Sequence, residues 1–244
     1  MSGPTPAAGP AAPPFPRLTL VALDATVFPD GVIVRLVAAP PPAALLAALY
    51  GPAAPLALRV LAATDPVLQR ALGGVHLVHP ADWPTGPGAG WIIAPFVRAP
   101  GPDTASRFSD GSYGVWYGAD RLETAQAEVG HHLGAYLAKT GAVPDALPRT
   151  VLHATSSPLH PVVDLRPAGA APPGVLAPHT YAASQPFGVR CRQAHQWGIV
   201  WPSVRRTGGT CLAVLRPPVL TGCVATATCT AVWDGRRLTW RDSR

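Results

Sequence analysis

The sequence predicts a mixed α/β fold in one main domain, and two segments carry that prediction. Residues 107–139 combine a turn, a short strand and a long helix, while residues 184–215 combine a helix with two strands. A chain of 244 residues can bury one sizeable core or two small ones, and no long linker divides it. We therefore expect a single domain over residues 17–244 after a disordered Pro/Ala-rich tail at residues 1–16.

The first segment has clear local signals. Residues 111–112 are typical of a turn, and residues 115–117 are typical of a short strand. Asp120 and Glu123 have the spacing of a helix N-cap and its capping-box partner. Apolar residues then recur at helical spacing, which predicts a helix over about residues 121–139 with a glycine near its end.

Glu128 lies on the flank of that helix's apolar stripe, where it can face a cleft, and His132 follows one turn later. Each polar residue also has an ordinary interpretation. Glu128 fits a solvated helix face, Arg107 a surface charge, and Tyr117 a core residue. His131 and His132 are adjacent and lack an HExxH motif, so we interpret them as solvated or packed histidines and expect no metal site.

The second segment reads as a helix over about 184–196, a buried strand at 198–201 and a strand at 211–215. A polar turn between the strands is centred on Ser203 and on the glycines at 208–209.

Ser203 also raises the alternative of a serine hydrolase. The sequence around it, WPSVRR, lacks the glycines of a nucleophile elbow. Partners for a catalytic triad exist in the chain, namely His160, His179, His195 and Asp164. Labelling by a fluorophosphonate probe would favour this alternative.

The net charge of +6 and the pI near 9.6 do not indicate a nucleic-acid partner. Lys139 is the only lysine, the arginines are scattered, and no arginine run is interleaved with aromatic residues. The four cysteines lack CxxC spacing, which favours free thiols in a reducing compartment, and we expect a cytoplasmic protein.

Two further patterns are set aside. The apolar run 36–58 is long enough to cross a membrane, but its prolines divide it into a short helix at 43–50 and a second piece, so we expect soluble core packing and no membrane partner. Gly86, Gly88 and Gly90 match the start of a glycine fingerprint, but without a preceding strand they favour a tight loop over a dinucleotide or phosphate loop.

Taken together, the two segments resemble the RES domain family, named for an Arg, a Glu and a Ser. The matching residues are Arg107, Tyr117, Glu128 and Ser203, the last within GIVWPSVRRTGG. Further resemblance extends over most of the chain from about residue 30, including TGPGAGWIIAPF (85–96), SRFSDGSYGVWYGADRLETAQAEV (106–129) and WDGRRLTW (233–240).

The resemblance implies an α/β fold similar to ADP-ribosyltransferases, in which two small sheets form an NAD cleft. It implies an NAD phosphorylase or NAD glycohydrolase, with protein ADP-ribosylation as the alternative, and the toxin of a bacterial toxin-antitoxin pair. The implied partner is a small Xre-type antitoxin. The family also carries an arginine near its first strand. Arg35 in VIVRLV is the better match to it by order and spacing, and Arg17 is the alternative.

The residue chemistry suits this reaction. Cleavage of the nicotinamide-ribose bond develops positive charge at the anomeric carbon, which a carboxylate such as Glu128 can stabilise. Arg107 and Arg35 can bind the pyrophosphate or an incoming phosphate. Tyr117 can stack on nicotinamide, and Ser203 can orient nicotinamide or the carboxylate without acting as a nucleophile.

NAD is thus expected as the substrate, with inorganic phosphate as an optional co-substrate and no cofactor. An alternative of another class is a non-catalytic module that binds a nucleotide or a partner without turning it over. Loss of nicotinamide release in Glu128→Ala would separate the two.

Overall fold

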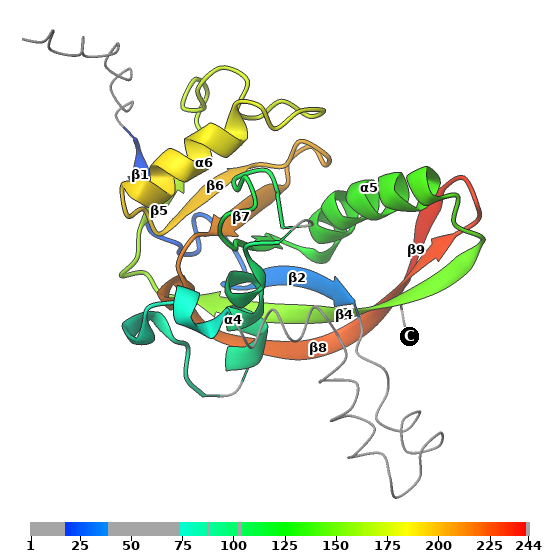
Figure 1. Ribbon diagram of the computed structural model, residues 1–244, viewed down its shortest axis with the longest axis horizontal. Helices are drawn as coiled ribbons and strands as arrows, with labels where there is room; N and C mark the ends of the chain where they lie inside the picture. The colour runs from blue at the N-terminus through cyan, green and yellow to red at the C-terminus, as the bar shows by residue number, and fades with distance from the viewer. Residues whose placement is uncertain (1–17, 39–73, 87, 102–103, 243–244) are drawn as a thin grey trace, which may run out of the picture.

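The computed structural model describes residues 18–38, 74–86, 88–101 and 104–242. Within these ranges the strands form one nine-stranded sheet in the order β1-β5-β6-β7-β3-β2-β4-β8-β9 (Figure 1). All neighbouring strands are antiparallel except β5 and β6. The strands are β1 Leu20–Val21, β2 Ile33–Ala38, β3 Trp116–Ala119, β4 Asp145–Ser156, β5 Val162–Asp164, β6 Gly198–Pro202, β7 Thr210–Val214, β8 Leu220–Trp233 and β9 Leu238–Asp242.

The described helices lie against this sheet, which confirms the mixed α/β class. Helix α5 contacts β2, β3, β8 and β9, and α4 contacts β3 and β8. Helix α6 packs on β6 and β7 through Phe187 and Cys191. The helices are α4 Ala89–Arg98, α5 Leu122–Thr140 and α6 Ser184–Gln193, with short 3₁₀ turns η2 Val75–Leu77, η3 Pro80–Asp82 and η4 Pro217–Val219.

The expected two small sheets are instead two halves of one continuous sheet. One half runs from β1 to β3 and the other from β2 to β9 in the spatial order. They are joined where β2 pairs with β3, and this pairing consists of the single register pair Val34 and Ala119. By contrast, β4 pairs with β8 along almost its whole length. The weak junction leaves room for a cavity between the halves.

The prediction for α5 is confirmed at its C-terminus and wrong by one residue at its N-terminus. Gly141 caps the helix end in the left-handed conformation, at φ 62°. The N-cap is Arg121 rather than Asp120, and no side chain caps the helix start. The Asp120 carboxylate instead accepts a hydrogen bond from Arg121 Nε through Oδ2 at 2.9 Å, while its buried Oδ1 has no hydrogen-bond partner among the described residues.

The prediction of a tight loop at Gly86, Gly88 and Gly90 is wrong in part, because helix α4 begins within this segment. Gly88 is the N-cap, at φ 82°, and the helix continues through Gly90 despite an internal proline, Pro95. A Cβ atom on Gly88 would overlap the Cys223 carbonyl, so the chain needs glycine there. Packing of the apolar helix face stabilises α4, because Ile92, Phe96 and Val97 are buried in the core.

Helix α6 and the two strands that follow it lie close to their predicted bounds. Helix α6 ends at Gln193, three residues earlier than expected, while β6 and β7 lie within one residue of the predicted strands. All four cysteines are buried thiols that form no disulfide. The tail 1–16 and the proposed helix 43–50 lie outside the described residues. In the described part of the chain, we find no helix with the length and apolar character needed to cross a membrane.

The C-terminal ends of α5 and α6 give a pair of opposite stability predictions. His195 follows α6 in the left-handed conformation at φ 55°, where its N–H donates to Arg192 and the next N–H donates to Cys191. This is the Schellman arrangement, in which glycine is preferred. Thermal unfolding should show His195→Gly stabilised by about 0.5–1 kcal/mol, because the left-handed strain is removed, and Gly141→Ala destabilised by about 1 kcal/mol. Destabilisation by His195→Gly would contradict the assignment of the strain.

Candidate functional site

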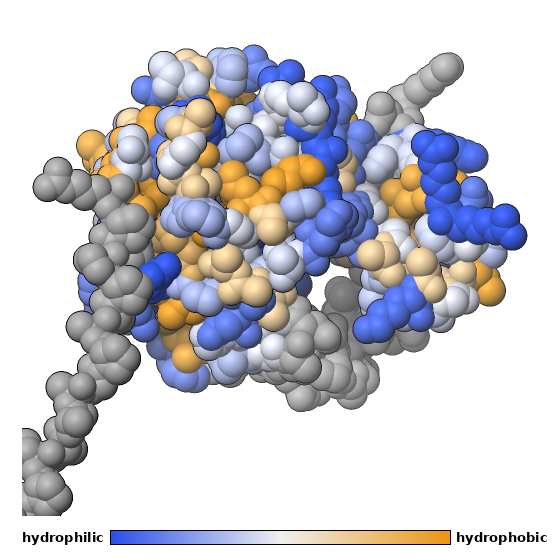
Figure 2. All heavy atoms as spheres, turned by 90° about the horizontal axis from the view of Figure 1, so that it is seen from above, coloured by the Kyte–Doolittle hydropathy of each residue, from blue (hydrophilic) through white to orange (hydrophobic). Residues whose placement is uncertain are grey.

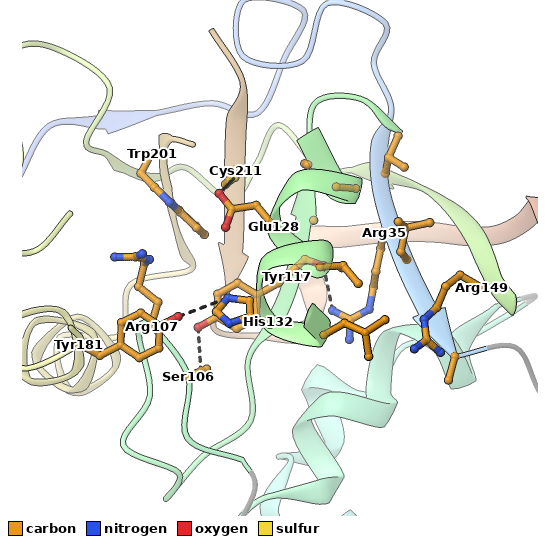
Figure 3. Close-up of a pocket in the computed structure, with 18 of the residues that line it drawn as sticks. Arg35, Ser106, Arg107, Tyr117, Glu128, His132, Arg149, Tyr181, Trp201 and Cys211 are labelled. Carbon is orange, nitrogen blue, oxygen red and sulfur yellow. Dashed lines mark hydrogen bonds between the residues drawn. The ribbon is translucent and has the colours of Figure 1, made fainter. Parts of the chain in front are cut away.

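A cavity of about 630 Å³ lies beside α5 at the junction of the two sheet halves. Seen from above, the surface is hollowed between the α6 side and the side that carries α5 and β9 (Figure 2). Four of the five predicted site residues line it, namely Arg35, Arg107, Tyr117 and Glu128 (Figure 3). The fifth, Ser203, contacts Glu128 directly.

Glu128 is held from one side only. Its Oε1 accepts a hydrogen bond from Ser203 Oγ at 2.6 Å and a longer one from Cys211 Sγ at 3.5 Å. Ser203 is itself fixed, since its Oγ accepts from the backbone N–H groups of Arg205 and Arg206 at 3.1 and 3.0 Å. Among the described residues, Oε2 of Glu128 has no such partner, so the carboxylate has one anchored oxygen and one oxygen for a ligand.

Arg107 is a buried cation at the same end of the cavity, with 6% of its surface exposed. Its Nη1 donates to the carbonyls of Ala177 at 3.0 Å and Val175 at 3.4 Å. The guanidinium lies 4.9 Å from the centre of the Tyr181 ring. No carboxylate in the described ranges forms an ion pair with it. A buried guanidinium held by neutral groups is suited to an anionic ligand.

The Tyr117 hydroxyl makes its hydrogen bonds within the protein. The hydroxyl accepts from the Phe108 N–H at 3.1 Å and bonds Ser106 Oγ at 2.9 Å. These two residues flank Arg107, so Tyr117 fixes the position of that arginine. Burial raises the pKa of the phenol to about 12, which keeps it protonated.

Arg35 lies at the junction of β2 and β3. Alternation along β2 places it on the α4 face with Ile33, opposite Val34. Its guanidinium packs on the Trp116 ring at 5.1 Å and donates through Nη1 to the Tyr117 carbonyl at 2.9 Å. Burial lowers its pKa to about 10, so it remains charged at neutral pH, and its buried Nε has no partner among the described residues. Arg35 therefore fills the gap where β2 and β3 separate.

Further residues line the cavity that the sequence did not single out as site residues. His132, interpreted as a solvated or packed side chain, faces the cavity, and its Nε2 lies 3.3 Å from the Tyr181 hydroxyl. Its position one turn after Glu128 was the available signal. No sequence pattern indicated Cys211 as a lining residue. Burial and the nearby Glu128 charge raise the pKa of its thiol. Ser106, Tyr181 and Arg149 are further polar residues of the lining that the sequence did not single out.

His132 makes the stability of the protein depend on pH. Burial lowers the pKa of its imidazole below the usual 6.5, and His131, Arg205 and Arg107 lower it further against the opposing effect of Glu128. The unfolded chain therefore binds a proton at a higher pH than the folded chain does. The free energy of unfolding should fall as the pH drops below about 6.5. Denaturant titrations of His132→Gln should show a shallower decline, and an unchanged slope would contradict this assignment.

The structure gives no support to a triad around Ser203. In the described part of the chain, no histidine ring is hydrogen bonded to its hydroxyl. Both carboxylate oxygens of Asp164 accept hydrogen bonds from Arg166. The ring of His160 packs on that of Trp197, with 4.0 Å between the ring centroids. Over those same residues, no group of three His, Cys, Asp or Glu side chains is arranged to hold a metal ion.

The family profile described as RES domain matches residues 78–234, which is more than half of the chain. The matched range contains Arg107, Tyr117, Glu128 and Ser203, while β1 and β2 precede it and belong to the same sheet. Among solved structures, the chain is similar to one in the crystal structure of the M. tuberculosis MbcT-MbcA toxin-antitoxin complex. That similarity has 18% identity and a TM-score of 0.36, and covers 50% of this chain and 71% of the other. No curated protein matches.

Proposed function

Because this chain belongs to the RES domain family, we propose that it binds NAD in the cavity beside α5 and cleaves the bond between nicotinamide and ribose. The observation that carries the proposal is the Glu128 carboxylate, which Ser203 anchors through one oxygen in a cavity that also contains the unpaired cation Arg107. These residues lie far apart in the sequence and come from a helix, a turn and a loop.

Glu128 acts on the reacting carbon. When the carbon-nitrogen bond breaks, its electron pair leaves with nicotinamide and the ribose becomes an oxocarbenium-like cation. The Oε2 atom of Glu128 stabilises that positive charge or orients the ribose hydroxyls, while Ser203 and Cys211 hold Oε1. Fixing the carboxylate in advance means that little reorganisation is needed during the reaction.

Arg107 binds the pyrophosphate beside the ribose. Its contacts with Val175 and Ala177 use Nη1 alone, so Nε and Nη2 can donate to phosphate oxygens. Tyr117 acts through Arg107, because its hydroxyl holds the residues on both sides of that arginine. The Arg107 guanidinium lies over the Tyr181 ring, which limits its movement.

Three acceptors complete the reaction after the same bond has broken. Phosphate gives ADP-ribose-1″-phosphate, water gives ADP-ribose and a proton, and a protein side chain gives a modified protein. NMR analysis of the products from NAD, with and without inorganic phosphate, identifies the acceptor. Purified protein that leaves NAD intact at micromolar concentration, with phosphate and candidate protein acceptors present, would rule out the proposed activity.

We also propose that the protein is the toxin of a bacterial toxin-antitoxin pair, as its family membership suggests. Consumption of NAD would stop growth, and a small Xre-type partner protein would prevent it. Induced expression should lower the cellular NAD content and arrest growth, and co-expression of a neighbouring Xre-type gene should restore both. Growth arrest at normal NAD content would argue for a different target.

A further inference from the structure

The cavity continues past Glu128 into a second arm beneath α5, which the proposed chemistry does not use. The arm lies where β2 and β4 run side by side, and its walls are mainly aliphatic. In Figure 3, Arg149 lies on the opposite side of α5 from Arg107. The residues that line the arm are Val34, Leu36, Ala38, Val129, Leu133 and Arg149.

Arg149 places an uncompensated positive charge in this arm. It pairs with Ala38 across β4 and β2, and alternation puts both on the α5 face together with Val151. Its side chain makes a single long contact, from Nη1 to the Pro148 carbonyl at 3.5 Å. Burial lowers the pKa of the guanidinium, and no carboxylate pairs with it in the described ranges. A half-buried guanidinium without an acidic partner is suited to an anionic ligand.

Strand geometry separates Arg149 from the reacting carbon. Cys211, which contacts Glu128, pairs with Ala119, and Ala119 pairs with Val34. These two steps and a third, from Ala38 to Arg149, cover about 15 Å across the sheet, and the four residues from Val34 to Ala38 cover about 13 Å along it. A phosphate that attacks the anomeric carbon at Glu128 cannot reach Arg149. A dinucleotide with its nicotinamide ribose at Glu128 can extend its adenosine half into the arm.

The cavity has more arginine side chains than the pyrophosphate of NAD has negative charges. Arg107, Arg35 and Arg149 contribute three positive charges, and Glu128 is the one carboxylate among the lining residues that the structure describes. The pyrophosphate of NAD carries two negative charges. Arg107 and Arg35 together match them, which leaves Arg149 without a negative charge to bind. A further phosphate on the adenosine ribose would match the third guanidinium, and the aliphatic wall would contact the adenine ring.

We propose, on the basis of the proposed function, that Arg149 binds a phosphate on the adenosine half of the substrate and that the site accepts NADP as well as NAD. Arg149 is then a specificity-determining residue at the end of the cavity opposite to Glu128.

The test compares kcat/KM for NADP and NAD in the wild type, Arg149→Gln and Arg236→Gln. Arg236 is an exposed arginine in the β8–β9 turn, and its replacement is the matched control. The wild type should cleave both dinucleotides. Arg149→Gln should lower the NADP to NAD ratio of kcat/KM by about ten- to a hundredfold, because one charge-assisted interaction is lost, and the control should keep the wild-type ratio.

Three outcomes would overturn the assignment of Arg149. These are a wild type that cleaves NAD and leaves NADP intact, equal losses on both substrates in Arg149→Gln, and a raised KM for inorganic phosphate with an unchanged ratio. Calorimetric titration of Glu128→Gln with each dinucleotide tests binding without turnover. Tighter binding of NADP that disappears in the Glu128→Gln, Arg149→Gln double variant supports the inference even if no bond is cleaved, whereas equal binding contradicts it.

Discussion

Replacing Glu128 with glutamine is expected to lower kcat for NAD cleavage by about a thousandfold, which is typical for removal of a charge that stabilises the transition state. The amide oxygen of glutamine can still accept from Ser203 and Cys211, so the local structure should persist. The loss should therefore fall on kcat, with a much smaller change in KM. Steady-state measurement of nicotinamide release gives both parameters.

Glu123→Gln on the same helix is the matched control. Glu123 is exposed in the first turn of α5 and does not line the cavity, so its replacement should leave kcat within about twofold of the wild type. A Glu128→Gln variant with wild-type kcat would mean that this carboxylate does not take part in bond cleavage. A similar loss in both variants would point to a general effect of charge on the helix.

Gly188→Ala is expected to destabilise the protein by about 3 kcal/mol, the upper end of the usual cost of overpacking. Gly188 is buried in α6, and an added Cβ atom would lie 2.8 Å from Phe108 Cα and closer still to its carbonyl. Backbone cannot move aside as a flexible side chain can, so α6 or the loop must shift. That loop carries Arg107, and NAD cleavage should fall together with stability.

Gly90→Ala tests whether the effect comes from the close contact. Gly90 lies in α4, and a Cβ atom there meets nothing within 4 Å among the described residues. Alanine favours a helix more than glycine does, so this variant should be neutral or slightly more stable. Urea denaturation compares the two. A Gly188→Ala variant as stable as Gly90→Ala would contradict the close packing of α6 against Phe108.

Helix α5 shows which features the sequence predicts well. Its apolar spacing and the terminal Gly141 are local signals, and both bounds were predicted to within about one residue. The N-cap was assigned wrongly because Asp120 has the residue type of a cap but pairs with Arg121. A neighbouring charge can compete for a capping side chain, and the sequence pattern does not show which partner wins.

Helix α4 was missed because its local signals argue against it. Three glycines precede or enter it, and Pro95 lies inside it, all of which lower helix propensity. Burial of Ile92, Phe96 and Val97 against the sheet outweighs that preference. Tertiary packing of this kind depends on strands that are distant in the sequence, including β8, and no local pattern reports it.

The cavity was predicted in part. The sequence indicated Glu128 on a helix flank, and the family resemblance linked it with Ser203. The Ser203 Oγ lies 2.6 Å from Glu128 Oε1, although the two residues are 75 positions apart. Cys211, Tyr181 and Arg149 were not recognised, because their access to the cavity depends on strand pairing and loop position. The pairing of β2 with β3 through one residue pair, which opens the cavity, also has no local signature.

The most direct test of an NAD cleft between the sheet halves is a crystal structure of Glu128→Gln with NAD bound, since the inactive variant should preserve the substrate. We expect the anomeric carbon of the nicotinamide ribose within about 4 Å of the residue 128 side chain, close to the reacting distance. The pyrophosphate should contact Arg107, and the adenosine half should extend beneath α5. NAD bound outside this cavity, or with nicotinamide at the Arg149 end, would contradict the proposed site.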